Sequence, residues 1–366
     1  MIIDSIHLQD FRNFKDEKAV FSPALNIIIG ENAQGKTNLM EAIYLTSFGK
    51  SFRTRNDQEM IRFGADFCRV SAAFSEMDAD KIQVVIGRDG KKAAMIDRRK
   101  IEKTSQLLGQ VICIAFTPED LKIVKEDPAR RREFIDRELS RISRAYLEDL
   151  KTYRKALQQR NAALKEQTFR GNQDEALDIW DEILAASGAE IIERRRRFLA
   201  EISQVSSRIH RGITNGREEL QVSYSCSIPL SLQKKKIRET LYETLREERS
   251  KDRERGFTGK GPHRDDLILS INEVNARKFG SQGQQRTAAL SLKLAEIDIV
   301  RKTTGQNPIL LLDDVLSELD VERQQYMIET LKDVQMMITT TEVGSQVEKE
   351  LADAERIRIC RGKVEA

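Results

Sequence analysis

The chain has 366 residues, of which 39% are hydrophobic and 33% charged, so it can bury a sizeable core and we expect one large or two ordinary domains. Its net charge is only +3, which excludes a uniformly basic nucleic-acid-binding protein and leaves room only for a local basic patch. Four scattered cysteines without a Cys-x-x-Cys pair, and three histidines, argue against a zinc site or a disulfide framework. The N-terminus lacks a secretory signal and no apolar run reaches about 18 residues, so we expect a cytoplasmic protein that does not cross a membrane.

The first predicted element is a strand in residues 1–14, which ends in the sequence DFRNF. Ile6 and Leu8 fall on one face of this strand. Arg12 has two interpretations. It is either a surface arginine in a turn or a contact to a nucleotide, because this strand should pair near the phosphate loop that follows.

A phosphate-binding loop is predicted between a strand at residues 25–29 and a helix that begins near residue 37. Residues 30–37 read GENAQGKT, the G-x-x-x-x-G-K-[ST] pattern. Gly30 and Gly35 let the backbone approach a polyphosphate, Lys36 supplies positive charge, and Thr37 offers an oxygen to Mg²⁺. A chance glycine turn is the alternative, but the flanking strand and helix favour the motif. The predicted ATP-binding residues are Gly30, Glu31, Asn32, Ala33, Gln34, Gly35, Lys36, Thr37 and Asn38, with Arg12 as a further candidate.

The segment after the first helix contains a basic loop and several strands. Residues 50–55, KSFRTR, form either a solvated loop or a loop that contacts phosphate. Strands are expected at residues 67–74 and 81–87, and Asp89 and Gly90 predict a hairpin turn into residues 93–96. Residues 111–116 form an apolar run that fits a buried strand, and a helix should start at Thr117 and Pro118.

Two long helices are predicted next, and they should form an antiparallel hairpin. Apolar residues at steps of three and four run from Ile135 to Leu157, and again from Trp180 to Ile209 after a turn signal at residues 170–172. Arg195 interrupts the second apolar stripe with a charge. A strand at residues 220–227 and a third charged helix at residues 232–253 should follow.

This helical region carries a basic excess. Residues 125–165 hold 12 Lys and Arg against 7 Asp and Glu, and dense runs occur at residues 130–132 and 194–197. For any single arginine, a solvated helix face is the simpler interpretation. For the set as a whole, DNA-phosphate binding is equally consistent, and Arg130, Arg131 and Arg132 are the candidate contacts.

The C-terminal part contains a glycine-rich loop, FTGKGPHRDD, at residues 257–266. Strands at residues 267–271 and 274–279 should form a hairpin around Asn272 and Glu273. The sequence GSQGQQR at residues 280–286 then leads into a helix, and small residues at a helix start suit an anion.

A buried strand at residues 309–312 ends in two acids, Asp313 and Asp314. Together with a phosphate loop, Asp313 suits Mg²⁺, and Asp314 is placed to orient or deprotonate water. Further strands are expected at residues 336–341 and 357–360.

The ordered set GENAQGKTN, GSQGQQR and LLLDDVLSELD resembles the ATPase heads of the ABC class. Within that class, the chain resembles the SMC-like branch and the RecF family of bacterial recombination mediators. DFRNF, KSFRT, TPEDLKIVKEDPARRREFID and GPHRDD carry the same likeness, which covers nearly the whole chain.

The resemblance implies an α/β ABC-type P-loop ATPase head with a mixed sheet and a helical arm. Residues 1–127 would form the N-terminal part of the head, residues 128–255 the arm, and residues 256–366 the C-terminal part of the head. The implied roles are Walker A for residues 30–37, the Walker B carboxylate for Asp313 and the catalytic acid for Asp314. The signature reaching the nucleotide of a second subunit would be Ser281, Gln282, Gly283 and Gln284.

The function implied by the resemblance is an ATP-gated DNA clamp in repair and replication. ATP should drive a homodimer that holds DNA at gaps or duplex/single-strand junctions, works with RecR and RecO to load RecA, and releases DNA on slow hydrolysis. Asp314 stands where the general ABC pattern has Glu, and Thr340 or its neighbour stands where many members have a switch histidine. Both departures argue against fast hydrolysis.

Two other functions were weighed. The ATPase subunit of a membrane transporter would have a shorter, less charged helical lobe without the basic excess. An SMC-type chromosome-structural protein would need hundreds of heptad residues, for which this chain has no room.

Overall fold

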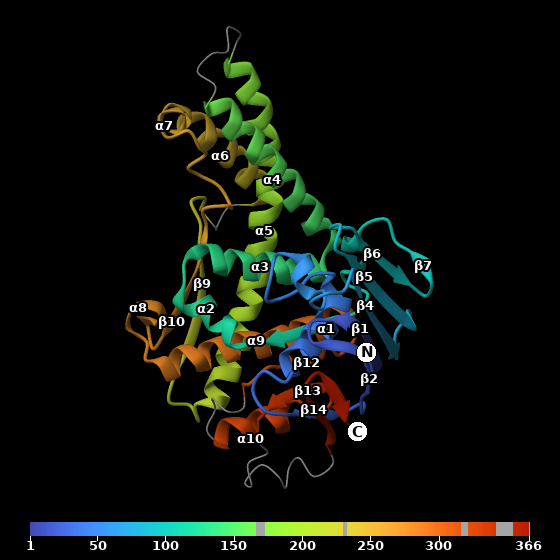
Figure 1. The fold of residues 1–366 in the computed structure, drawn as a ribbon. Coiled ribbons are helices and arrows are strands. Elements are labelled where there is room, and N and C mark those ends of the chain that lie inside the picture. The colour runs from blue at the N-terminus through green and yellow to red at the C-terminus, as the bar shows by residue number, and fades with distance from the viewer. Residues whose placement is uncertain (166–172, 230–232, 316–320, 342–353, 366) are drawn as a thin grey trace. The chain divides into compact units, whose positions relative to one another are not determined.

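The computed structural model describes residues 1–165, 173–229, 233–315, 321–341 and 354–365 (Figure 1). They divide into two compact units. Unit 1 consists of Met1–Leu121, Gly212–Asn215 and Lys293–Ala366, and unit 2 of Lys122–Arg211 and Gly216–Leu292. Among the described residues, no helix is both long enough and apolar enough to span a membrane.

The first sheet of unit 1 is mixed and has the strand order β15-β14-β3-β13-β12-β8. Five of these strands are parallel neighbours, and only β15 is antiparallel. The strand sequences ILLL and CIAF are buried throughout, as expected for a parallel sheet covered on both faces. Their bounds are β3 (Leu25–Ile29), β8 (Cys113–Phe116), β12 (Ile309–Leu312), β13 (Met336–Thr340), β14 (Glu355–Cys360) and β15 (Lys363–Glu365).

The second sheet of unit 1 is antiparallel and has the order β2-β1-β4-β5-β6-β7. Strands β4 and β5 alternate buried and partly buried residues, as expected for the strands predicted from the sequence. The prediction of one strand over residues 1–14 is wrong at its end, because Arg12 has a φ of 53° and turns the chain between two strands. The strands are β1 (Ile2–Phe11), β2 (Phe14–Val20), β4 (Phe67–Ser75), β5 (Lys81–Gly87), β6 (Lys92–Ile96) and β7 (Arg99–Lys100).

Helix α1 (Lys36–Phe48) contacts strands of both sheets, and its buried side chains Leu39, Met40 and Ile43 share one core with them. This core fixes the phosphate loop that precedes α1. Unit 1 also contains the short helices η1 (Asp57–Met60), η2 (Thr104–Leu107), η3 (Pro118–Leu121) and α10 (Val321–Thr330).

Unit 2 is mainly helical, with a three-stranded sheet in the order β11-β10-β9. The predicted antiparallel hairpin of long helices is confirmed, because residues early in α4 contact residues late in α5, and residues late in α4 contact residues early in α5. Tyr146 contacts Arg195, and Arg160 contacts Asp181. The elements are α2 (Lys122–Lys125), α3 (Pro128–Ile142), α4 (Arg144–Lys165), α5 (Gln173–Ile213, whose last residues belong to unit 1), β9 (Leu220–Ser225), α6 (Lys234–Glu247), α7 (Arg249–Arg255), β10 (Asp266–Ile271), β11 (Val274–Asn275), α8 (Ala276–Phe279) and α9 (Gln282–Thr304, which continues into unit 1).

Three expected elements of unit 2 differ from the structure. The first long helix is interrupted at Ser143, whose extended backbone ends α3 and whose hydroxyl accepts a hydrogen bond from the N–H of Tyr146. The strand expected at 274–279 ends at Asn275, because the side chain of Asn275 accepts a hydrogen bond from the N–H of Lys278 and so caps the start of α8. The third charged helix is divided into α6 and α7 at Glu248. Residues 170–172 and 316–320, which carry a turn signal and the end of the last motif, lie outside the described residues.

The charge that interrupts the apolar stripe of α5 has a structural explanation. Arg195 is buried and donates hydrogen bonds to the carboxylate of Asp136, the hydroxyl of Tyr146 and the carbonyl of Pro262. A second buried guanidinium, that of Arg160, is paired with the buried carboxylates of Asp181 and Asp252. Buried charges of this kind are tolerated when every polar group has a partner.

Candidate functional site

The phosphate-binding loop adopts a conformation that requires its two glycines. A Cβ atom on Gly30 would lie 2.4 Å from the carbonyl oxygen of Ile359 on β14. Gly35 has a φ of 123°, which side-chain-bearing residues rarely adopt. The sequence motif therefore reflects two steric constraints of unit 1.

The turn between β14 and β15 is hydrogen-bonded to the phosphate loop at Gln34. The carbonyl of Gln34 accepts hydrogen bonds from the N–H of Gly362 at 3.1 Å and from the Asn13 side chain at 2.7 Å. Its side-chain oxygen accepts from the N–H of Arg361. Gln34, predicted as an ATP-binding residue, thus anchors the loop and does not line the cavity described next.

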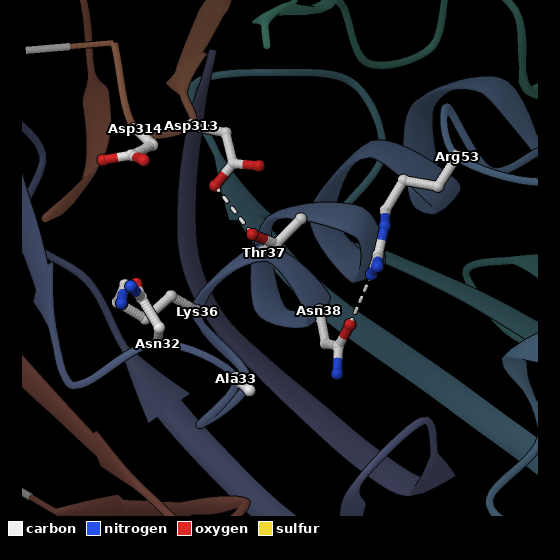
Figure 2. A pocket seen from close by; sticks show the side chains of 9 residues that line it. Asn32, Ala33, Lys36, Thr37, Asn38, Arg53, Asp313 and Asp314 are labelled. Carbon is white, nitrogen blue, oxygen red and sulfur yellow. Dashed lines mark hydrogen bonds between the residues drawn. The ribbon is translucent and has the colours of Figure 1, made fainter. Parts of the chain in front are cut away.

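A cavity of about 370 Å³ opens at the start of α1 (Figure 2). The carboxylates of Asp313 and Asp314 at the end of β12 face the loop and the first turn of α1. This arrangement brings together eight residues that the sequence predicted as one site. They are Asn32, Ala33, Gly35, Lys36, Thr37, Asn38, Asp313 and Asp314, and Arg53 is the ninth lining residue.

Lys36 supplies the positive charge of this cavity. Its Nζ atom donates to the carbonyl oxygens of Gly30 at 2.6 Å and Glu31 at 2.9 Å. Burial lowers the pKa of Lys36, while the nearby carboxylates of Asp314 and Asp313 act to raise it. The contribution of Glu31 to the loop is its backbone carbonyl, which accepts the hydrogen bond from Lys36.

The acidic wall of the cavity is organised by a threonine that sequence reasoning did not single out. Asp313 Oδ1 accepts hydrogen bonds from the hydroxyls of Thr37 at 3.0 Å and Thr339 at 2.9 Å. The Thr339 hydroxyl also accepts from the backbone N–H of Asp314 at 2.8 Å. Thr339 is buried on β13, and one hydroxyl group thereby positions both acids.

The electrostatics of Asp313 match this geometry. Burial raises its pKa, the hydrogen bonds from Thr339 and Thr37 act in the opposite direction, and the charge of Asp314 adds to the rise. Asp314 has a φ of 56°, a left-handed conformation that aspartate tolerates better than most residues. The two adjacent side chains consequently leave the end of the strand in different directions, as Figure 2 shows.

Arg12 and Arg53 differ in their relation to the cavity. Arg12 donates to both carboxylate oxygens of Glu41, at 2.7 and 2.6 Å, and Glu41 is fully buried in α1. The guanidinium of Arg12 compensates this buried charge and is not among the groups that line the cavity, so a contact of Arg12 with the nucleotide stays a prediction. Arg53 does line it and donates to Asn38 Oδ1 at 2.7 Å, which favours the phosphate-contacting interpretation of the basic loop at residues 50–55.

The candidate signature residues lie in unit 2, at the start of α9. The hydroxyl of Ser281 accepts from the N–H of Gln284, and the side chain of Gln284 accepts from the N–H of Ser281. This reciprocal pair is a capping box, which leaves Gln282 and Gly283 exposed in the first turn. Gln284 also donates to Glu218 at 3.0 Å, a contact that no sequence pattern indicated.

The three arginines at 130–132 are not equivalent. Arg131 is buried and donates both to the carboxylate of Asp266 and to the carbonyl of Glu126, so the prediction that it contacts DNA is corrected to a structural role in unit 2. Arg130 is exposed but pairs with Glu133 of its own helix and with Glu126 just before that helix. Arg132 donates to the backbone carbonyl of Asp265.

Comparisons with known proteins identify the family of the chain. Residues 2–358 match the family described as RecF/RecN/SMC N terminal domain. A protein of Alkaliphilus oremlandii named DNA replication and repair protein RecF is 44% identical over 93% of this chain and 93% of its own length. A protein of the same name from Bacillus cereus is 42% identical over 100% of this chain and 98% of its own. The chain belongs to the RecF family.

Solved structures support the assignment of the fold. One described as the recombination mediator protein RecF-ATP in the RecFOR pathway has a TM-score of 0.90 and 36% identity, over 100% of this chain and 97% of that one. An Smc head has a TM-score of 0.58 at 17% identity, which shows a shared fold alone. The expected α/β ABC-type head with a helical arm is therefore confirmed.

Proposed function

We propose that this chain is an ATP-dependent DNA-binding recombination mediator whose unit 1 binds and slowly hydrolyses ATP. The observation that carries the proposal is the joining of the phosphate loop to the two acids at the end of β12 in one cavity. RecF relatives along the full chain length, including a solved RecF with ATP, support the identity of the nucleotide.

The donors present fit Mg²⁺ as the metal of the site. The hydroxyl of Thr37 and the carboxylate of Asp313 are hard oxygen ligands 3.0 Å apart, and Mg²⁺ usually takes one or two carboxylates and completes its shell with phosphates and water. When bound, Mg²⁺ would neutralise charge on the phosphates.

Phosphate binding and proton acceptance are assigned to different side chains of the site. Lys36 and the N–H groups at the start of α1 bind phosphate oxygens, because both carry positive charge. Asp314 is the candidate group to accept a proton from the attacking water, since it lines the cavity beside Asp313 and its φ of 56° directs its side chain differently from that of Asp313. Arg53 contributes a further positive charge at the same wall.

We further propose that ATP brings two copies together, with Ser281, Gln282, Gly283 and Gln284 of one copy reaching the nucleotide of the other. The capping box supports this role because it presents the first turn of α9 in a fixed conformation. DNA at gaps or duplex/single-strand junctions, RecR and RecO as partners, RecA loading and a cytoplasmic location complete the proposal. The solved neighbour's place in the RecFOR pathway supports the partners.

The test is ATP-dependent binding of the full chain to duplex, single-stranded and gapped DNA, measured beside Lys36→Met and Lys91→Met. Lys36→Met removes the phosphate-binding charge and should abolish the ATP-dependent gain in DNA affinity and in dimer formation. Lys91 is an exposed surface lysine of unit 1, with its side chain 89% accessible, so Lys91→Met should behave like the unmodified chain. An ATP response that survives in Lys36→Met would refute the assignment of the site.

A further inference from the structure

The loop that connects α7 with β10 is fixed by buried contacts of unit 2. The backbone N–H and the hydroxyl of Thr258 both contact Asn161 Oδ1 at 2.8 Å, and the N–H of Gly259 donates to Asp252. Gly261 has a φ of 122°, and a Cβ atom there would lie 2.5 Å from the Tyr153 hydroxyl. The loop is thus held in one conformation by its own backbone contacts.

His263 contributes to this anchoring. Burial lowers its pKa to about 4, so the ring is neutral at pH 7 and carries one N–H. Because Nε2 faces the carbonyl of Thr258 at 2.9 Å, that nitrogen must be the donor, and Nδ1 accepts from the Tyr153 hydroxyl at 2.7 Å. His263 is therefore a structural residue of the loop.

Two side chains of this rigid loop project into solvent and contact each other. Phe257 is 40% exposed, and the guanidinium carbon of Arg264 lies 4.7 Å from the centre of its ring. The exposed part of the Phe257 ring is available to a planar ligand. Stacking of an arginine on an aromatic ring also leaves one face of the guanidinium for a further planar group.

The charge around this pair is positive. Both acids of the loop are already used, since Asp265 is buried and accepts the Tyr224 hydroxyl, and Asp266 is bound by Arg131.

Within the described part of the chain, no carboxylate lies within 4 Å of the charged groups of Arg132, Lys260 or Arg264. Burial lowers the pKa of Arg132, the charges of Arg195 and Arg264 lower it further, and those of Asp266 and Asp136 act to raise it, so the guanidinium groups of Arg132 and Arg264 lie near each other. Cations without acidic partners attract phosphates.

We propose that Phe257 and Arg264 form a stacking platform for an unpaired base of single-stranded DNA, with Lys260 and Arg132 facing the adjoining phosphates. The inference rests on the proposed DNA-binding function and adds that unit 2 recognises single-stranded DNA. Every base offers a planar face that an aromatic ring or a guanidinium can cover, whereas the paired bases of a duplex do not expose it. A protein partner would be the alternative occupant.

The experiment measures binding of the full chain with ATP to an oligothymidylate that carries one 2-aminopurine and to a duplex of equal length. Phe257→Ala should weaken single-strand binding roughly 5- to 150-fold and abolish the fluorescence change of the stacked base, with little effect on the duplex. Phe257→Trp should retain both. Lys260→Ala should flatten the salt dependence by about 0.7 in log–log slope, because it removes a phosphate contact, whereas Phe257→Ala should not.

Phe67→Ala is the matched control. Phe67 is 43% exposed in β4 of unit 1, and the guanidinium carbon of Arg69 lies 5.8 Å from its ring centre, but the lysines of the adjoining loop, Lys91 and Lys92, are paired with Asp89 and Asp57. Equal single-strand affinity in the Phe257→Ala and Phe67→Ala variants would overturn the platform and leave the surface to a protein partner. Equal losses on single strand and duplex would also overturn it. Failure of the unmodified chain to bind any DNA would overturn the proposed function together with the platform.

Discussion

Replacing Thr339 by valine tests whether one hydroxyl group organises the two acids of the nucleotide site. The substitution keeps the branched shape of the side chain and removes two hydrogen bonds, one to the carboxylate of Asp313 and one from the N–H of Asp314. A hydrogen bond to a charged group contributes about 1.5–3 kcal/mol, and an orphaned, partly buried N–H costs about 1 kcal/mol. The free energy of unfolding should therefore fall by about 2–4 kcal/mol.

The assay is urea unfolding at neutral pH without nucleotide, beside Thr46→Val. Thr46 is also fully buried in unit 1, but its hydroxyl donates only to the carbonyl of Ile43, so its replacement should cost about 0.5–1.5 kcal/mol. Repeating Thr339→Val in an Asp313→Asn background should reveal a coupling of about 1 kcal/mol, because the hydroxyl then faces a neutral oxygen. Equal losses for the two threonines, or an additive double mutant, would refute the reasoning.

Three further predictions follow from charges described above. Asp314→Asn should retain ATP binding but lower the hydrolysis rate by about 10²- to 10⁴-fold, and its DNA complexes should outlast those of the unmodified chain after competitor is added; an unchanged rate would exclude Asp314 as the base. Arg160→Leu should lower the free energy of unfolding by about 3–5 kcal/mol, because it leaves the buried carboxylate of Asp252 without its guanidinium partner and leaves Asp181 paired with Arg249 alone, whereas breaking the exposed Lys151 pair with Lys151→Ala should cost under about 0.5 kcal/mol; similar denaturation midpoints would contradict this. Asp313→Asn should raise the unfolding midpoint at pH 7–8 and abolish hydrolysis. Burial raises the pKa of Asp313 in the folded chain, so the ionised carboxylate lowers the free energy of unfolding above that pKa, and this loss disappears as the pH falls toward the pKa of the unfolded chain. A stability difference between the variant and the unmodified chain that does not change with pH would refute this prediction.

The phosphate loop and the acids after β12 could be predicted from sequence because each depends on local order. Gly30, Lys36 and Thr37 lie between a strand and a helix, and a carboxylate that follows a buried strand falls at the edge of the sheet. Thr339 could not be identified in this way, since its role depends on β13 lying beside β12 in register. A run of three threonines at the end of a strand gave no indication of which hydroxyl would face inward.

Charged residues were the least predictable from sequence. Arg12, Arg131 and Arg195 occur in sequences that look solvated, yet each is bound to a carboxylate from a distant part of the chain. A basic run specifies composition but not the partner of each guanidinium. The break at Ser143 was missed for a related reason, because apolar spacing continues through it while a single hydroxyl begins a new helix.

The position of β3 in its sheet has a consequence for the order in which the molecule is completed. This strand leads directly into the phosphate loop, yet its neighbours on both sides are β13 and β14, which come from the far end of the chain. During synthesis, β3 therefore leaves the ribosome with both hydrogen-bonding edges free, and they stay free until Met336 and the residues after it have been translated. A nascent chain stopped before that point should be a target for chaperones and proteases, and the ability to bind nucleotide should arise only as translation ends.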